Sequence, residues 1–152
     1  MPKPCRLPHL AAASIAACVL LSALHAPLAA QQQAESPSVA TAGLDVFVAT
    51  GADSAIAVWL SGATFDTPAT RASLGQGFAR MAEQRGPMLG YDVVRVFPIG
   101  THVRRVYAVL HYEEGPGYLN LEMYRTAGGW VAQAVEFNAD PGEVFPPGLL
   151  EP

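Results

Sequence analysis

Cysteine and lysine are nearly absent from this sequence of 152 residues. The two cysteines and the single lysine all lie near its start, as Lys3, Cys5 and Cys18. The rest of the chain therefore has no disulfide and no thiolate that could bind a metal or attack a substrate. A domain of this length buries enough apolar surface to fold without cross-links.

Basic charge is also scarce beyond residue 30. Seven arginines there face thirteen acidic residues, which gives a net charge of −6. Nucleic-acid binding depends on Lys and Arg contacts with phosphates, so we expect no nucleic acid among the partners of an acidic, lysine-free chain. The sequence also contains no phosphate-binding glycine loop and no GxSxG nucleophile motif.

The first thirty residues are typical of a secretory signal peptide. Lys3 and Arg6 precede an apolar run over residues 7–24, and small residues ending at Ala30 precede three glutamines. This order of basic, apolar and small residues predicts cleavage after Ala30. The remaining protein is then periplasmic or secreted, in a bacterium, with no stable membrane insertion after cleavage.

Two alternatives concern the same apolar run. Its length approaches the ~20 residues that span a membrane, which would suit a retained anchor. Residues 15–18 end in Cys18 and resemble a bacterial lipobox, but apolar residues follow Cys18 where a polar tether is usual. Cleavage explains Pro27 and the glutamines better, and lipidation of Cys18 is left open.

The remaining chain divides into a leader, one domain and a tail. We expect a flexible leader over residues 31–41, a domain over residues 42–146 and a loose C-terminal tail over residues 147–152. Proline and glycine are frequent from residue 139 onward, which predicts no regular element there. Within this stretch we expect Val144 and Phe145 to lie on the domain.

Three helices are predicted at the start of the domain. The first begins near Thr41 and ends at Gly51, and the second covers residues 54–60 after Asp53 as its cap. The third follows Thr67-Pro68, carries one apolar helical stripe and ends before residue 86; the stripe consists of Leu74, Phe78, Met81 and Ala82. Gly75 and Gly77 inside it indicate either close packing on a sheet or a backbone site for a ligand.

Four strands follow, over residues 91–97, 103–112, 118–125 and 130–138. Short turns at 98–100, 115–117 and 127–129 predict an antiparallel meander. The second and fourth strands alternate apolar residues on both faces: Val106, Ala108 and Leu110 against Val103, Tyr107 and Val109, and Val131, Val135 and Phe137 against Trp130, Ala132 and Ala134. The helices cover only one face, so the other predicts a homodimer, unless the tail wraps across it.

Element order and the last strand resemble the NTF2-like superfamily. That strand reads Gly129-Trp130-Val131 at its start and Glu136-Phe137-Asn138 at its end, with Asp140-Pro141 after it. The similarity covers residues 41–146 and is closest to small exported bacterial members without an assigned activity. It implies an α+β fold in which three N-terminal helices roof a curved four-stranded antiparallel sheet, a cone with a cavity. The superfamily includes isomerases, dehydratases, polyketide cyclases and binding modules, so the fold alone does not decide the function.

Four residues are candidates for a ligand pocket in such a cone: Trp59, Phe78, Tyr107 and His111. His111 and Tyr107 share one strand face and have the chemistry for acid–base catalysis, although the favoured interpretation of His111 is a core histidine hydrogen-bonded to a neighbour. His111 and Glu113 have a spacing that suits two metal ligands, but no third ligand is evident, so we predict no metal and no cofactor.

Two functions fit these observations. The first is a non-enzymatic exported module that binds a small apolar ligand or an envelope protein. The second is a cofactor-free lyase or isomerase acting on a small hydrophobic substrate in the cone. A cavity containing His111 would favour the enzyme. A cone packed solid by Trp59, Phe78 and Leu121 would favour an interaction role.

Overall fold

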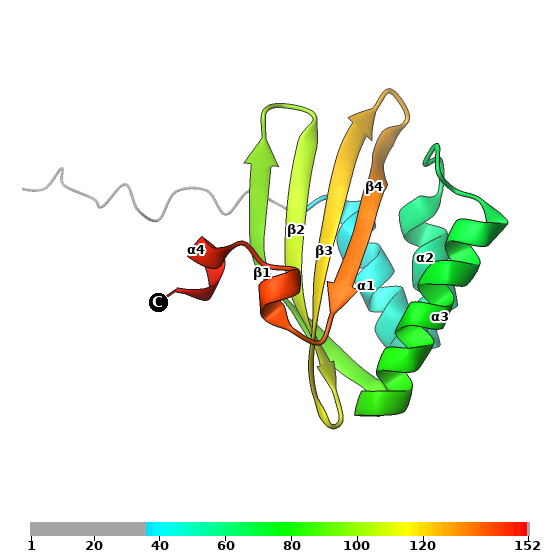
Figure 1. Ribbon diagram of the computed structural model, residues 1–152. Helices are drawn as coiled ribbons and strands as arrows, with labels where there is room; N and C mark the ends of the chain where they lie inside the picture. The colour runs from blue at the N-terminus through cyan, green and yellow to red at the C-terminus, as the bar shows by residue number, and fades with distance from the viewer. Residues whose placement is uncertain (1–35, 152) are drawn as a thin grey trace, which may run out of the picture. The chain divides into compact units, whose positions relative to one another are not determined.

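Three helices cover one face of a four-stranded antiparallel sheet in the computed structural model, which describes residues 36–151 (Figure 1). The helices are α1 (Ser38–Thr50), α2 (Ala52–Leu60) and α3 (Pro68–Arg85). The strands are β1 (Met88–Ile99), β2 (Val103–Tyr112), β3 (Gly115–Thr126) and β4 (Gly129–Asn138), and they pair in that order. This is the predicted α+β architecture. The predicted signal peptide lies outside the described residues.

Local sequence explains where each helix begins and ends. Thr67 caps α3 by accepting a hydrogen bond from the Thr70 amide at 3.1 Å, and Pro68 occupies the first helical position, as predicted. Gly86 ends α3 with a φ of 78°, and Gly51 joins α1 to α2 with a φ of 99°. Both values lie in the left-handed region that glycine adopts without steric cost.

The beginning of α1 differs from the prediction. The helix starts at Ser38 after Pro37, without a side-chain cap, so residues 38–41 belong to the helix and not to a leader. Thr41 lies inside α1 and donates its hydroxyl to the Ser38 carbonyl at 3.1 Å. Proline restricts the backbone conformation of the residue before it, so a helix is often preceded by one. Pro37 therefore explains the start of α1 better than the predicted cap, Thr41, does. Within residues 36–151, no helix is both long and apolar enough to cross a membrane.

The strand β2 has the predicted limits, whereas β1, β3 and β4 extend beyond theirs. The turn between β2 and β3 is at residues 113–114, so the glycines and proline of 115–117 pair within β3 instead of forming the turn. A Cβ on Gly117 would lie 2.7 Å from the Met81 sulfur and 3.0 Å from the Tyr112 ring, so little room is left for a side chain at this strand position. Glycine in a strand is often found where another group approaches the backbone this closely.

A register shift in β4 changes which of its residues face the helices. Glu122 pairs with Ala134 and the next residue, Met123, pairs with Ala132, so Gln133 is an extra residue on β4. Such a bulge reverses the alternation of side chains beyond it. Trp130 and Ala132 therefore join Val135 and Phe137 in the helix-side core, and the predicted division of β4 into two constant faces is wrong.

The core lies between the helices and the sheet. Its largest fully buried side chains include Trp59 from α2 and Phe78 from α3, together with Leu110 of β2 and Leu121 of β3. The predicted alternation in β2 is confirmed, because Val106, Ala108 and Leu110 are all buried on this side. The buried residues of β3 on the same side are Leu119, Leu121 and Met123. We call the opposite side of the sheet the outer face.

The C-terminal segment, residues 140–151, lies against part of the outer face (Figure 1). It contains the 3₁₀ helix η2 (Pro141–Glu143) and the short helix α4 (Pro147–Leu150), where we expected no regular element. Val144 and Phe145 are buried against Tyr107, as predicted, and Leu149 packs beside them. Asp140 caps η2 by accepting the Gly142 amide at 2.9 Å, which explains how a proline- and glycine-rich stretch forms a turn of helix.

Candidate functional site

The four predicted pocket residues lie on two different sides of the sheet. Trp59 and Phe78 belong to the helix-side core, whereas Tyr107 belongs to the cluster under the C-terminal segment. His111 shares the outer face with Tyr107, since the two residues are four positions apart on β2. The structure therefore does not bring the four residues together in one cavity.

Trp59 and Phe78 fill space in the core. Trp59 is fully buried and donates its indole N–H to the Ala40 carbonyl at 3.1 Å. Phe78 stacks on Phe137 with ring centroids 3.9 Å apart. Leu121 is also fully buried, so these three side chains fill the middle of the interface between the helices and the sheet.

On the outer face, Tyr107 and His111 make the contacts of ordinary structural side chains. The Tyr107 ring meets Phe145 edge-on at 5.6 Å between centroids. The His111 Nε2 lies 3.1 Å from an Asp92 carboxylate oxygen, and both side chains are exposed to solvent. This arrangement suits a surface ion pair, which is worth little energetically. Among the described residues, no three His, Cys, Asp or Glu side chains gather closely enough to hold a metal ion.

A separate cleft opens at one end of the helix layer. Its volume is about 880 Å³, and its walls come from the α1–α2 corner, from α3 and from the adjoining ends of β1 and β2. We call it the corner cleft. Its lining is mostly small or apolar: Phe47, Ala49, Ala72, Phe78, Ala79 and Met88 are representative. The volume falls within the range of about 300–1,000 Å³ that is usual for small-molecule sites.

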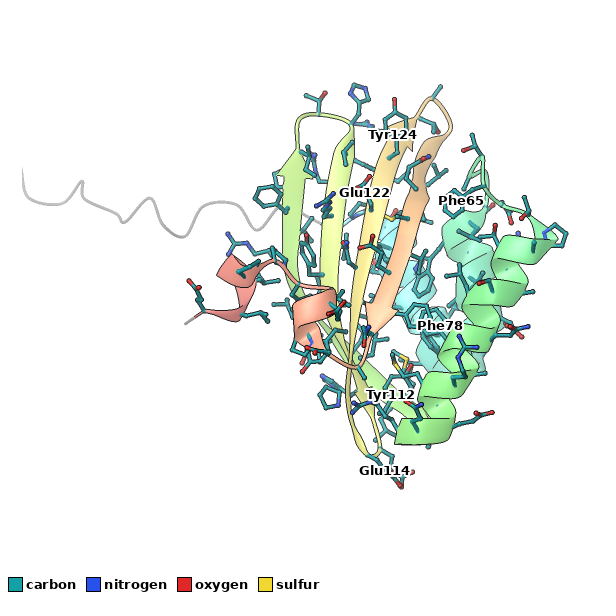
Figure 2. The ribbon with its side chains drawn as sticks, in the orientation of Figure 1. Phe65, Phe78, Tyr112, Glu114, Glu122 and Tyr124 are labelled. Atoms are coloured by element: carbon teal, nitrogen blue, oxygen red, sulfur yellow. The ribbon has the colours of Figure 1, made fainter. Side chains whose placement is uncertain are left out.

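Tyr112 gives the corner cleft its most informative polar group. The side chain is only 5% exposed, and among the described residues no hydrogen-bond partner reaches its hydroxyl. Burial raises the pKa of Tyr112 to about 12, so the hydroxyl keeps its proton and remains a donor. Figure 2 shows Tyr112 and Phe78 on the side of the sheet that α3 covers. A buried donor without a partner costs free energy that an acceptor on a ligand would recover.

The two unusual glycines of α3 have different environments. At Gly77 a Cβ would collide with the Phe137 ring, so this glycine allows α3 to pack closely on β4. Gly75 instead lines the corner cleft, and a Cβ there would lie 2.9 Å from an Asp53 carboxylate oxygen across the α2–α3 contact. The packing alternative is confirmed at Gly77, and ligand contact at Gly75 stays a prediction.

Sequence reasoning missed Tyr112, although a signal for it was present. Tyr112 lies two positions after Leu110 on β2 and therefore shares the strand face of Val106, Ala108 and Leu110. That face is the one that the helices cover. What the alternation could not show is that α3 ends beside it, where Gly86 and Pro87 lead directly into β1. The open end of the helix layer, and hence the cleft, depends on how the helices pack on the sheet, which local sequence does not show.

Comparison with protein-family models, with curated proteins and with solved structures gives no match to this chain.

Proposed function

We propose that the protein is an exported, NTF2-like binding module whose corner cleft takes a small, mainly apolar ligand bearing one hydrogen-bond acceptor. The observation that carries the proposal is the buried, unpartnered Tyr112 hydroxyl in the lining of an 880 Å³ cleft. Helices roofing a curved antiparallel sheet support the NTF2-like assignment. The signal-peptide pattern of residues 1–30 supports export.

The chemistry of the cleft supports a neutral ligand. Alanine and glycine positions on α3 leave a shallow apolar wall beside Phe47 and Met88, against which a flat apolar body can lie. Asp53, an exposed residue of the lining, disfavours an anion by charge repulsion. Tyr112 adds a buried donor to the lining, which suits a carbonyl or ether oxygen.

No observation favours the alternative lyase or isomerase. Its two acid–base candidates, Tyr107 and His111, lie on the outer face, away from the corner cleft and from the packed core. The burial of Trp59, Phe78 and Leu121 in the interior supports a non-enzymatic role.

A matched pair of probes tests the role of Tyr112. We expect 2-acetylnaphthalene, which has a carbonyl, to bind more tightly than 2-ethylnaphthalene in a fluorescence titration. Tyr112→Phe should weaken binding of the ketone by up to about tenfold and leave the hydrocarbon unchanged, because only the ketone accepts the phenol hydrogen bond. Equal affinities of wild type and Tyr112→Phe for the ketone would refute this role.

A second pair of variants tests the location. Ala79→Trp places a large ring inside the corner cleft, whereas Arg80→Trp places the same ring at an adjacent exposed position that does not line it. Loss of binding in the first variant only is the expected result. Unimpaired binding by Ala79→Trp would mean that the probes occupy another part of the molecule.

A further inference from the structure

A second cavity lies between the outer face and the C-terminal segment, and it differs in character from the corner cleft. Its volume is about 290 Å³, and we call it the tail cavity. The floor comes from β2, β3 and β4, and the roof from residues 142–146. Its charged lining residues are Arg105, Glu122, Glu136 and Glu143.

The charges in the tail cavity do not cancel. Arg105 pairs with Glu122, with its Nε and a terminal guanidinium nitrogen each 2.9 Å from one carboxylate oxygen. Among the described residues, only the Asn120 side chain donates a hydrogen bond to the Glu136 carboxylate, from its Nδ2 at 2.8 Å. Glu143 adds a third carboxylate from the roof. One positive and three negative groups leave an excess of negative charge, which favours a cation.

Asn120 provides an independent observation that points to a ligand. The residue is 6% exposed, lines the tail cavity, and its Oδ1 has no hydrogen-bond partner among the described residues. Reversing the amide would set Oδ1 against the Glu136 carboxylate, so the orientation with Nδ2 toward Glu136 is the favourable one. The cavity thus contains a buried acceptor that is held in place and lacks a donor, which is costly in a protein interior.

We propose that the tail cavity binds a primary ammonium group carried on a short aliphatic stem. An ammonium ion has three N–H donors and one positive charge, which match the Asn120 Oδ1 acceptor and the surplus carboxylates. The rings of Tyr107 and Phe145 and the Val144 side chain supply apolar walls for the stem. Because no three metal-binding side chains gather among the described residues, hydrogen bonding fits this lining better than metal coordination does.

We assign the ammonium group to another molecule. The described residues contain no lysine, since Lys3 is the only one in the chain. Two sources share the required chemistry: a free small alkylamine, and the side chain of a lysine on another protein. A cavity of 290 Å³ is at the small end for ligand sites, which suits a single stem of this kind.

Titration of the full chain with n-butylamine, followed by amide NMR shifts of residues around Asn120, tests the proposal. We expect saturable binding with a dissociation constant of about 1 mM, a weak affinity suited to so small a ligand. The neutral analogue 1-butanol should not bind. Absence of saturable shifts with butylamine, or equal binding of butanol, overturns the proposal.

Variants then locate the site. Glu136→Gln keeps the shape of the side chain and removes its charge, and we expect butylamine to bind at least about tenfold more weakly. Ala134→Leu fills the tail cavity from β4 and should abolish binding by a different route. Glu83→Gln, an equal charge change at an exposed position on α3, is the matched control and should bind as wild type does. Equal binding by Glu136→Gln and Glu83→Gln contradicts the site.

Nα-acetyl-lysine methylamide distinguishes the two sources. If it binds at the same residues as butylamine, the tail cavity admits a lysine side chain presented by a protein. If only butylamine binds, the ligand is a free amine. Both results support an ammonium site, whereas failure of both compounds to bind overturns it.

Discussion

The Trp59 indole occupies the space in which a Cβ on Gly43 would lie, so that α2 contacts the backbone of α1 directly. The same indole donates to the Ala40 carbonyl at 3.1 Å, one turn earlier on α1. One side chain therefore fixes the corner between the first two helices by shape and by a hydrogen bond. This corner forms one wall of the cleft to which we assign the ligand.

Gly43→Ala should destabilise the domain although alanine is the better helix former. The gain in helix propensity is at most about 1 kcal/mol, whereas forcing a methyl group into a packed contact typically costs about 1–3 kcal/mol. Urea denaturation of the variant should therefore show a lower midpoint. Gly148→Ala, where a Cβ meets open space, is the control and should leave the midpoint unchanged.

Phe78→Ala tests the contact between α3 and the sheet. Phe78 is 1% exposed, stacks on Phe137 and meets Phe47 edge-on at 4.9 Å between centroids. Removing so large a buried ring should lower the free energy of unfolding by about 3–5 kcal/mol. Phe97→Ala removes an equal ring that is 52% exposed, and it should change stability little. Equal denaturation midpoints for the two variants would contradict the packing described.

Much of this fold could be predicted from local pattern. Thr67, Pro68 and Gly86 set the limits of α3 through capping and backbone geometry, which depend only on neighbouring residues. The bulge at Gln133 could not be predicted, because a register shift is decided by the pairing of β4 with β3. The separation of Tyr107 from Trp59 by the sheet also needs the tertiary fold, as does the open end of the helix layer beside Tyr112.

Alkaline stability should report on Tyr112. Burial raises the pKa of Tyr112 from its ordinary 10.0 to about 12, so the folded protein holds this proton more tightly than the unfolded chain does. Its contribution to stability is complete below pH 10 and is lost as the pH rises from about 10 to about 12. Burial, followed by a hydrogen bond to Asp45, raises the pKa of Tyr91 to about 12 as well, and this residue adds to the same loss.

Tyr112→Phe should therefore lose less stability than wild type over this pH range. Thermal denaturation at several values between pH 8 and pH 12 measures the difference, since phenylalanine has no proton to release. Tyr124→Phe, at a side chain that is 41% exposed, is the matched control. If the pH dependence of Tyr112→Phe matched that of wild type, the buried phenol would not be the group responsible.

The C-terminal segment should limit association through the outer face. Val144 and Phe145 cover Tyr107, and Phe145 also meets Tyr118 at 5.3 Å between ring centroids. The homodimer expected from the sequence stays a prediction. It must either displace this segment or pair through the uncovered strip of the outer face, where Phe97 and Ile99 are 52% and 41% exposed.

Deleting residues 141–152 should therefore strengthen self-association by at least about tenfold. The deletion exposes Tyr107 and Tyr118, which Phe145 covers, and so enlarges the apolar strip that is already exposed. Apolar patches larger than a few hundred Å² are rarely left open to water. Deleting only residues 147–152 keeps Val144 and Phe145 in place and serves as the control. Sedimentation velocity over a range of protein concentrations measures both variants against the intact chain. The expected order is strongest association for the longer deletion, with the control close to the intact chain. An unchanged association constant in the longer deletion would show that covering Tyr107 has no bearing on how copies of this chain meet.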